Sequence, residues 1–365
     1  MAIERSERAQ VLDLSRPSAV EVEIEVSEAA EVLMSICALV DRDDFDTLDL
    51  GAPWLQARLA SVPKDLLDAI DEVTLSSKVA GHLLGVVLET PKPRTFAAFL
   101  ERLEATDPVE LNLHLFGGFG SSVNHAGPDV IERAARGDAE AQETFLQSLS
   151  EFSDKYERAR TLLELGGDEL KARLLDLLPR WYEHVFEPNA EEWREAAERD
   201  AESKRALAAK HSPEQLVELA ARGYQYSPAP GITAIALFPS WWMRPWVILW
   251  EHKGTKIFCY PIAAAPEEGA SPAEVARVYK ALGDEGRLRL LRRLSDGPLK
   301  LTEAAAELGV AKSTAHHHLA ILRQAGFVAI RDEDENVYSL RRDLPQTGDL
   351  LSAYLGSSKS SATSA

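Results

Sequence analysis

Cysteine is scarce in this chain of 365 residues, which contains only Cys37 and Cys259. Neither has a second Cys or a His at the spacing that zinc sites use, so we expect no disulfide framework and no cysteine metal site. Long apolar runs are missing too, because no stretch reaches the roughly 18 residues of a membrane-spanning helix. The N-terminus shows neither the apolar core nor the cleavage site of a signal peptide. These absences predict a cytoplasmic protein without a membrane partner.

Positive charge is also in short supply. The chain has 40 Lys and Arg against 59 Asp and Glu, a net charge of −19. Such a balance disfavours binding to nucleic acid, since duplex affinity rests largely on cations that neutralise phosphates. The negative charge is unevenly distributed, however, because the net charge is −20 over residues 1–270 and +1 over residues 271–345. Only the second segment suits a nucleic-acid surface, and its modest charge predicts weak or strongly salt-sensitive affinity.

Residues 299–328 have the pattern of two short helices joined by a tight turn and followed by a strand. Thr302 is predicted to cap a first helix over 303–308, because its hydroxyl can accept a hydrogen bond from a free amide of the first turn. Gly309 follows that helix and can adopt the left-handed backbone of a sharp turn. A second helix is predicted over 312–324. This arrangement is a helix-turn-helix, a common way of placing side chains in a DNA groove.

At about 100° per residue, the second predicted helix has an apolar side and a polar side. Its apolar side is expected to face the core and is made of Ala315, Leu319 and Leu322, with His318 at the edge. Its polar side combines small and hydrogen-bonding residues, namely Ser313, His317, Ala320 and Gln324, flanked by Lys312 and His316. We expect the polar side to be offered to base edges.

Further predicted elements flank this motif. Residues 271–274 have the spacing of a capping box and open a helix to about Leu282, and Asp284 caps another helix that ends at about Leu294. Residues 327–331 and 337–341 alternate as strands around a turn-forming segment. They predict a hairpin, or wing, after the second helix, and a weaker helix follows at about 348–355.

Residues 271–355 resemble the ArsR/SmtB family of bacterial winged-helix repressors. The resemblance is carried by residues 281–288, 308–310, 313–314, 317–319 and 322–328. It implies a homodimer built on the first and last helices of this module. It further implies that the second helix of each motif enters one of two successive major grooves of double-stranded operator DNA, and that the protein represses transcription.

The predicted DNA contacts form two groups. Side chains on the polar side of the second helix would reach bases: Lys312, Ser313, His316 and His317. Residues that flank the motif or begin the wing would contact the DNA backbone: Lys300, Thr302, Thr314, Arg323 and Arg331. In the family the position of Lys312 is usually Gln and that of His316 is often Ser, so the base preference of relatives does not transfer to this chain.

The best-known members of the family sense metal ions. The helix before the turn has no Cys-x-Cys here, because residues 301–306 read Leu-Thr-Glu-Ala-Ala-Ala. His316, His317 and His318 project about 100° apart on a helix and cannot converge on one ion. We therefore predict no metal site and no cofactor, and a repressor that responds to metal through non-standard ligands remains an alternative.

Residues 18–265 are predicted to form a separate, mainly helical domain with a small β-sheet, which makes the whole chain an α+β protein. Residues 20–26 alternate as a half-buried strand, and residues 27–219 follow a helical pattern. A strand-rich patch covers 232–260, and the simplest arrangement pairs it with the first strand. This part resembles, more weakly, a module of unknown function fused to such winged helices, through its Val-Glu-Val-Glu-Ile-Glu-Val-Ser opening.

The ends of the chain and the connection between the domains are predicted to be irregular. A flexible tail is expected over 1–17 and a disordered tail over 356–365. The segment 263–270, with its Pro, Glu and Gly, is the predicted linker. The winged helix-turn-helix domain itself is predicted to occupy 271–355.

An aromatic cluster in the strand-rich patch is the candidate effector site. Trp241, Trp242, Trp246, Trp250 and Tyr260 either line a pocket for an unknown small molecule or fill a core. A protein effector bound to the acidic domain is the other option. In both cases the effector would favour one dimer geometry and so change the separation of the DNA-reading helices.

A Gly-rich segment raises the alternative of an enzyme that uses the winged helix as an interaction platform. Within residues 117–125, Ser121, Ser122 and His125 lie close together. The segment lacks the Lys and spacing of a phosphate-binding loop, Gly-x-Ser-x-Gly is absent, and no acidic partner is indicated. We therefore predict a transcriptional regulator and not an enzyme.

Overall fold

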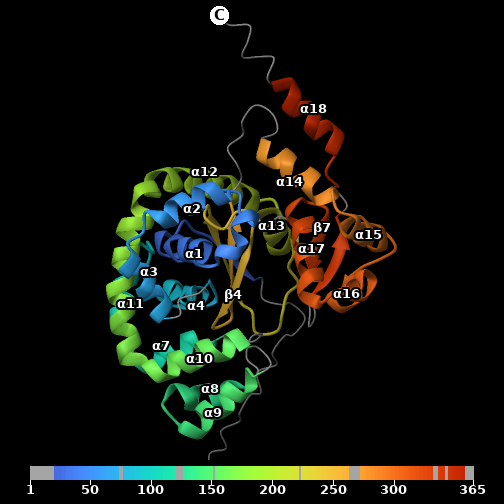
Figure 1. Ribbon diagram of the computed structural model, residues 1–365. Helices are drawn as coiled ribbons and strands as arrows, with labels where there is room; N and C mark the ends of the chain where they lie inside the picture. The colour runs from blue at the N-terminus through green and yellow to red at the C-terminus, as the bar shows by residue number, and fades with distance from the viewer. Residues whose placement is uncertain are drawn as a thin grey trace, which may run out of the picture.

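The structure, a computed structural model, describes residues 20–73, 77–119, 126–150, 153–221, 223–262, 272–331, 336–341 and 344–357. A large helical body, residues 20–262, surrounds a central sheet, and a smaller module, residues 272–357, lies beside it (Figure 1). We call these the N-terminal region and the winged-helix module. The predicted tails and linker lie outside the described residues, apart from residues 356 and 357. Among the described residues, no helix is long and apolar enough to cross a membrane.

The central sheet of the N-terminal region has four strands in the order β1-β3-β5-β4. Their bounds are β1 Glu21–Ile24, β3 Ala234–Ser240, β5 Thr255–Pro261 and β4 Ile248–His252. The first three are parallel and β4 joins antiparallel through a tight turn, in which Lys253 and Gly254 both have positive φ. This confirms the prediction that the first strand pairs with the strand-rich patch.

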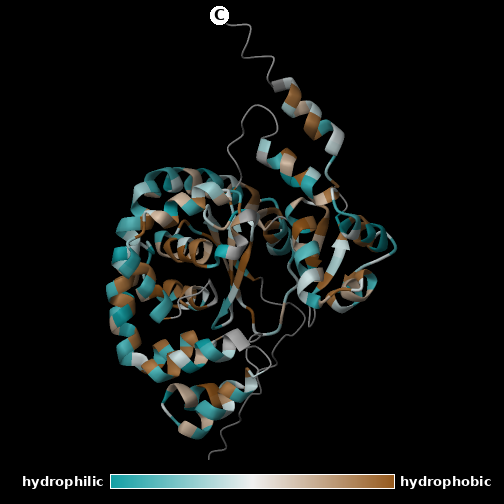
Figure 2. Cartoon of the chain, viewed as in Figure 1, coloured by the Kyte–Doolittle hydropathy of each residue, from teal (hydrophilic) through white to brown (hydrophobic). Residues whose placement is uncertain are grey.

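Helix α1, Glu28–Val40, is the centre of the larger core and has hardly an exposed side chain. Ser27 caps it by accepting a hydrogen bond from the amide of Ala30 at 3.2 Å. The surrounding helices turn their apolar sides inward, as Figure 2 shows by their brown inner faces. These helices are α2 Ala52–Ala60, α3 Lys64–Glu72, α4 Ser77–His82, α5 Leu84–Glu89, α6 Phe96–Ala105, α7 Pro108–Leu115, α8 Pro128–Ala135, α9 Ala139–Ser148, α10 Ser153–Leu165, α11 Gly167–Trp181, α12 Ala190–Ala208 and α13 Pro213–Ala220, with the shorter turns η1 Arg42–Thr47, η2 Tyr182–Phe186 and η3 Glu187–Asn189.

Glu31 is an ionisable residue enclosed in this apolar core. Its side-chain Oε1 accepts hydrogen bonds from the backbone amides of Trp241 and Trp242 at 2.6 and 2.9 Å. Burial raises the pKa of Glu31 to about 8, although those hydrogen bonds act in the opposite direction. Glu31 therefore fixes the turn after β3 to helix α1.

The winged-helix module follows the order predicted from the sequence. Its helices are α14 Pro272–Leu282, α15 Glu285–Leu294, α16 Leu301–Leu308, α17 Lys312–Gln324 and α18 Thr347–Ser357, and its strands are β6 Leu299–Lys300, β7 Val328–Arg331 and β8 Val337–Leu340. Asp284 caps α15 by accepting from the amide of Arg287 at 2.9 Å, as predicted. The predicted cap at Thr302 is wrong, because α16 already begins at Leu301 and the amide of Lys300 donates to the carboxylate of Glu303 at 2.7 Å.

A short strand of the N-terminal region, β2 (Tyr224–Gln225), joins the sheet of the winged-helix module. The order of this second sheet is β2-β7-β8-β6, with β2 parallel to β7. The amide of Ile330 donates to the carbonyl of Gly223 at 2.9 Å, and one apolar cluster runs from α13 into the winged-helix module. A second tie is the ion pair between Arg277 of α14 and Asp49, at 2.8 Å. The two parts therefore pack as neighbours that share a sheet.

Candidate nucleic-acid interface and an adjoining cavity

Helix α17, the second helix of the helix-turn-helix, begins three residues after Gly309, whose left-handed backbone (φ +69°) turns the chain sharply away from α16. Ala315, Leu319 and Leu322 are buried against the module. The four predicted base-reading residues are all exposed: Lys312, Ser313, His316 and His317. All four side chains are accessible to solvent, and His316 also borders the cavity that faces the N-terminal region. The base contacts themselves stay a prediction.

At the C-terminal end of α17, two residues predicted to be exposed on the polar side are not fully exposed. Ala320 was expected to face outward, but its exposed fraction is only 5%. Gln324 is half-buried, and its side-chain nitrogen is shielded from solvent. His318 packs at the edge of the core with Nδ1 3.7 Å from the Asp284 carboxylate, as its place beside the apolar stripe predicted. Only the first two turns of α17 are thus open to a DNA groove in this arrangement.

The residues predicted to contact the DNA backbone fall into two groups by exposure. Lys300, Thr302 and Thr314 are exposed near the ends of the two helices of the motif. Arg323 and Arg331 are instead half-buried on the side that faces the N-terminal region. A phosphate contact by Arg323 would require that side to open, so this assignment stays a prediction.

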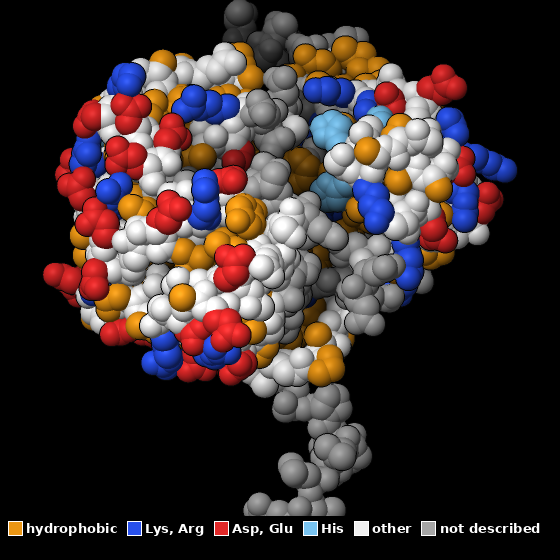
Figure 3. Space-filling model, turned by 60° about the horizontal axis from the view of Figure 1, so that its bottom comes forward, with side chains coloured by type: hydrophobic (Ala, Val, Ile, Leu, Met, Phe, Trp, Pro, Cys, Tyr) orange, Lys and Arg blue, Asp and Glu red, His pale blue; other side chains and the backbone are white. Residues whose placement is uncertain are grey.

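A cavity of about 340 Å³ lies between the N-terminal region and the winged-helix module. Figure 3 shows histidine side chains on the smaller lobe where it faces the larger one across a furrow. The winged-helix module contributes His316, Arg323, Ile330 and Asn336 to the walls, and the opposite walls come from α4, the end of α7, β2 and the β4–β5 hairpin. We call this space the interdomain cavity.

The walls from the N-terminal region are unusually rich in imidazole rings. His82 packs on Trp250 with ring centroids 4.2 Å apart, and its Nδ1 lies 2.8 Å from the carbonyl oxygen of His114. His114 stacks on His252 at 5.0 Å, and the ring of Phe119 makes T-shaped contacts with both, at 4.7 and 5.0 Å. Burial lowers the pKa of His82 to about 4, so this imidazole is neutral at physiological pH. Burial also lowers the pKa of His316 across the cavity.

Two of the five aromatic residues predicted to form an effector pocket line this cavity. Trp246 and Trp250 border it from the strand β4 and the turn before it. Trp241 and Trp242 instead pack against Trp54 in the larger core, with ring centroids 5.7 and 5.3 Å from it. Tyr260 is enclosed in the cluster that joins the two parts. These three residues therefore fill cores and do not line the cavity. Trp241 and Trp242 follow the end of β3, whereas Tyr260 lies within β5.

Sequence reasoning missed most of the cavity. His82, His114 and Tyr224 come from segments without a recognisable motif, and Arg323 was assigned to DNA. No local pattern could have indicated them, since they meet only after folding. Of the Gly-rich segment, Gly117 and Phe119 border the cavity, whereas residues 120–125, with Ser121, Ser122 and His125, lie outside the described part of the chain.

Comparison with known proteins bears on the winged-helix module. A family model described as "Bacterial regulatory protein, arsR family" matches residues 284–329. The uncharacterized HTH-type transcriptional regulator YceK of Bacillus subtilis is 40% identical over 75 residues, which make up 20% of this chain and 75% of that protein. This chain belongs to the ArsR family. It is a transcriptional regulator with an ArsR-type DNA-binding domain, as the sequence predicted.

Two further ArsR-type relatives match the same region. The HTH-type transcriptional regulator NmtR of Mycobacterium tuberculosis is 37% identical over 65 residues, 18% of this chain and 54% of that protein. A cadmium resistance transcriptional regulatory protein, the CadC homolog of Staphylococcus aureus, is 36% identical over 69 residues, 19% of this chain and 57% of that protein. The chain therefore spans little more than half of these two relatives. The N-terminal region is unmatched, and no solved structure matches the chain.

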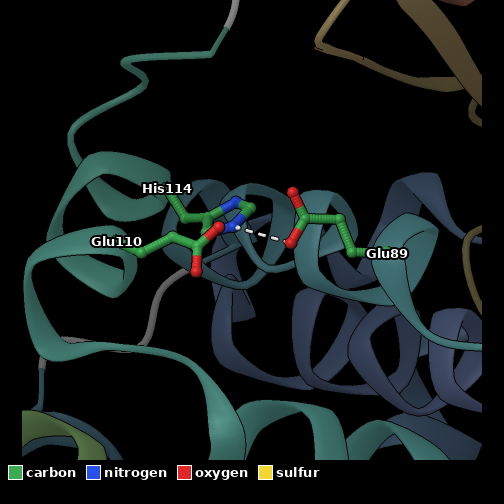
Figure 4. Close-up of side chains that lie close together, drawn as sticks. All are labelled: Glu89, Glu110 and His114. Atoms are coloured by element: carbon green, nitrogen blue, oxygen red, sulfur yellow. Dashed lines mark ion pairs between the residues drawn. The ribbon is translucent and has the colours of Figure 1, made fainter.

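The N-terminal region contains a cluster of three possible metal ligands among its described residues. Ligand atoms of Glu89, Glu110 and His114 lie within 4.8 Å of one another (Figure 4). Both carboxylates already pair with cations, because Arg102 and Lys253 each contact Glu89 and Glu110. Burial alone would raise the pKa of Glu89, but hydrogen bonds from the surrounding basic groups outweigh it and hold that pKa far below its ordinary value. A metal ion would have to displace these cations.

Proposed function

We propose that this ArsR-family regulator is a sequence-specific repressor that reads its operator with the first two turns of α17. The observation that carries the proposal is the joint exposure of Lys312, Ser313, His316 and His317 on the helix that the family places in the major groove. A lysine at this site can reach the acceptor atoms of guanine, and a hydroxyl or an imidazole can bond to either a donor or an acceptor. The combination differs from the usual family pattern, so a distinct operator is expected.

We propose further that the protein acts as a homodimer through α14 and α18. These helices pack together and project from the body of the molecule (Figure 1). The hydroxyl of Tyr279 on α14 donates to the carbonyl of Thr347 at the start of α18, at 3.2 Å. Large apolar side chains remain exposed on both helices, with Tyr279 at 41%, Tyr354 at 36% and Leu355 at 59%. A second copy of the chain would cover them, as in the dimer that the family resemblance implies.

The N-terminal region is proposed to modulate operator affinity through its contacts with the winged-helix module. The shared sheet and the pair between Arg277 and Asp49 fix the module relative to the acidic body. A ligand that binds one relative arrangement of the two parts better than another shifts the balance between them, and operator affinity shifts by the same free energy. Effector control therefore needs no contact between the effector and DNA.

The decisive experiment is selection of duplexes from a random pool by the full-length protein, followed by fluorescence anisotropy on the enriched sequence and a shuffled duplex of equal length. We expect at least ~1,000-fold preference for the enriched duplex, the lower range for specific DNA-binding proteins. Salt should weaken binding to both duplexes. Failure to enrich any sequence at low salt would refute operator recognition, and would leave the winged-helix module as an interaction platform.

A further inference from the structure

A guanidinium, that of Arg323, lies in the wall of the interdomain cavity. Arg323 lies in the last turn of α17 and borders this space. Within the described part of the chain, no carboxylate contacts it, and the phenols of Tyr338 and Tyr224 lie nearby. Burial is also strong enough to lower the pKa of Arg323. Removing a cation from bulk water is costly, so the site favours an incoming anion that can accept the forked hydrogen bonds of arginine.

The other charges among the described wall residues do not cancel Arg323. Lys256 and Glu251 are register partners on β5 and β4, where opposite charges offset each other. His82 is neutral at physiological pH, since burial lowers its pKa to about 4. The described walls therefore carry an excess positive charge, although the whole chain has a net charge of −19. This local excess would draw an anion into an otherwise acidic protein.

The opposite walls are aromatic. Trp250, backed by His82 at 4.2 Å, forms one side, and Phe119, packed edge-on against His114, forms another. Tyr224 and Ile330 close the space next to the winged-helix module. The volume of about 340 Å³ lies at the lower end of pockets for small organic ligands, roughly 300–1,000 Å³. These dimensions suit one or two fused rings and exclude a large cofactor.

From these features we propose that the interdomain cavity binds a small planar aromatic carboxylate, with the ring between Trp250 and Phe119 and the carboxylate on Arg323. The proposal rests on the proposed function, because it names the site and the chemical class of the effector. Such a ligand would bridge the N-terminal region and the recognition helix. Since His316 lines the same cavity and is also a proposed base-reading residue, the bound ligand would hold α17 against the N-terminal region and weaken operator binding. The ligand thus acts as an inducer.

The test is isothermal titration calorimetry of the full-length protein with 1-naphthoate and with 1-naphthamide, which has the same ring without the charge. We expect 1-naphthoate to bind at one site per chain and at least ~10-fold more tightly than the amide. Arg323→Gln should abolish that difference, whereas Arg292→Gln, which removes an exposed arginine on α15, should leave it unchanged. Trp250→Leu should weaken both compounds alike, which supplies a second readout if Arg323→Gln fails to fold.

Three results would overturn the proposal: equal affinity for acid and amide, unchanged 1-naphthoate binding in folded Arg323→Gln, or no 1-naphthoate binding below millimolar concentration. The titration uses no DNA, so its failure is separable from failure of operator recognition. If the protein binds an operator but not 1-naphthoate, only the cavity proposal is refuted. If the protein binds 1-naphthoate but enriches no operator sequence, only the proposed repressor function is refuted. Where both bind, 1-naphthoate should lower operator affinity in the wild type but not in Arg323→Gln.

Discussion

Tyr224 of the N-terminal region lies directly opposite Ile330 of the wing, in parallel register. The winged-helix module is therefore attached to the N-terminal region by strand pairing, because β2 supplies the fourth strand of its sheet. Tyr224 and Ile330 also border the interdomain cavity, in whose walls His316 and Arg323 of the recognition helix lie. Any ligand in that cavity touches the connection between the two parts, and this is the physical basis for coupling a signal to DNA binding.

Replacing His317 by Ala should weaken operator binding more than binding to a shuffled duplex. His317 is exposed on the second turn of α17, and loss of a base contact is worth about 1–3 kcal/mol of discrimination. Anisotropy titrations on both duplexes measure the difference. His211→Ala, an exposed histidine of the N-terminal region, serves as the control and should change neither affinity. Equal loss on both duplexes would reassign His317 to the DNA backbone.

Gly223→Ala should loosen the joint between β2 and β7. Gly223 has φ +87°, and an added Cβ would lie 3.4 Å from both the Val328 carbonyl oxygen and the Arg341 side chain. The resulting strain, about 1–3 kcal/mol, should reduce protection of the Ile330 amide in hydrogen exchange and raise operator affinity several-fold. Gly231→Ala is the matched control, since Gly231 has φ +85° but open space around it. An unchanged Ile330 exchange rate in Gly223→Ala would contradict the role assigned to this strand.

Leu355→Lys should convert the proposed dimer to a monomer. Leu355 is 59% exposed on α18, and a buried lysine at a dimer interface costs several kcal/mol unless it is paired. Light scattering after size-exclusion chromatography gives the mass, and operator affinity should fall because two half-sites no longer bind together. Leu219→Lys alters a similarly exposed leucine, 46%, on α13 and should keep the wild-type mass. A monomeric mass for the wild-type protein would contradict the proposed dimer.

Glu31 should make the stability of the fold depend on pH. Its pKa is raised in the folded protein from 4.5 to about 8, so the folded state binds the extra proton more tightly than the unfolded state does. Stability from this group is therefore complete below pH 4.5 and declines as the pH rises through about 8, by on the order of 3–5 kcal/mol. Glu31→Gln should flatten that decline in denaturant titrations across this range. Glu157→Gln, an exposed acid, should reproduce the wild-type curve, and a decline that persists in Glu31→Gln would disprove the assignment.

Zinc should not bind tightly at Glu89, Glu110 and His114. Arg102 and Lys253 already neutralise the two carboxylates, and a cation would have to enter beside these positive charges. Calorimetric titration of purified protein with Zn²⁺ is expected to show no stoichiometric sub-micromolar site, and operator affinity should not respond to Zn²⁺. A tight site that His114→Ala abolishes would establish the metal-responsive alternative.

Local sequence signals determined much of the winged-helix module. The cap at Asp284, the turn at Gly309 and the 3.6-residue periodicity of 312–324 act within a few residues, so α15, α17 and the buried apolar side of α17 follow from the sequence. The alternation of residues 20–26 likewise indicated β1.

Only the tertiary structure decided what surrounds the recognition helix. A two-residue strand such as β2 has no pattern of its own, and its pairing with β7 depends on packing between segments about a hundred residues apart. The same packing buried Ala320, which periodicity alone placed outward. It also moved Trp241, Trp242 and Tyr260 into cores and brought His82, Trp250 and Arg323 to one cavity. Periodicity shows which side of a helix is apolar, but the surface that a neighbouring region covers depends on how the whole chain packs.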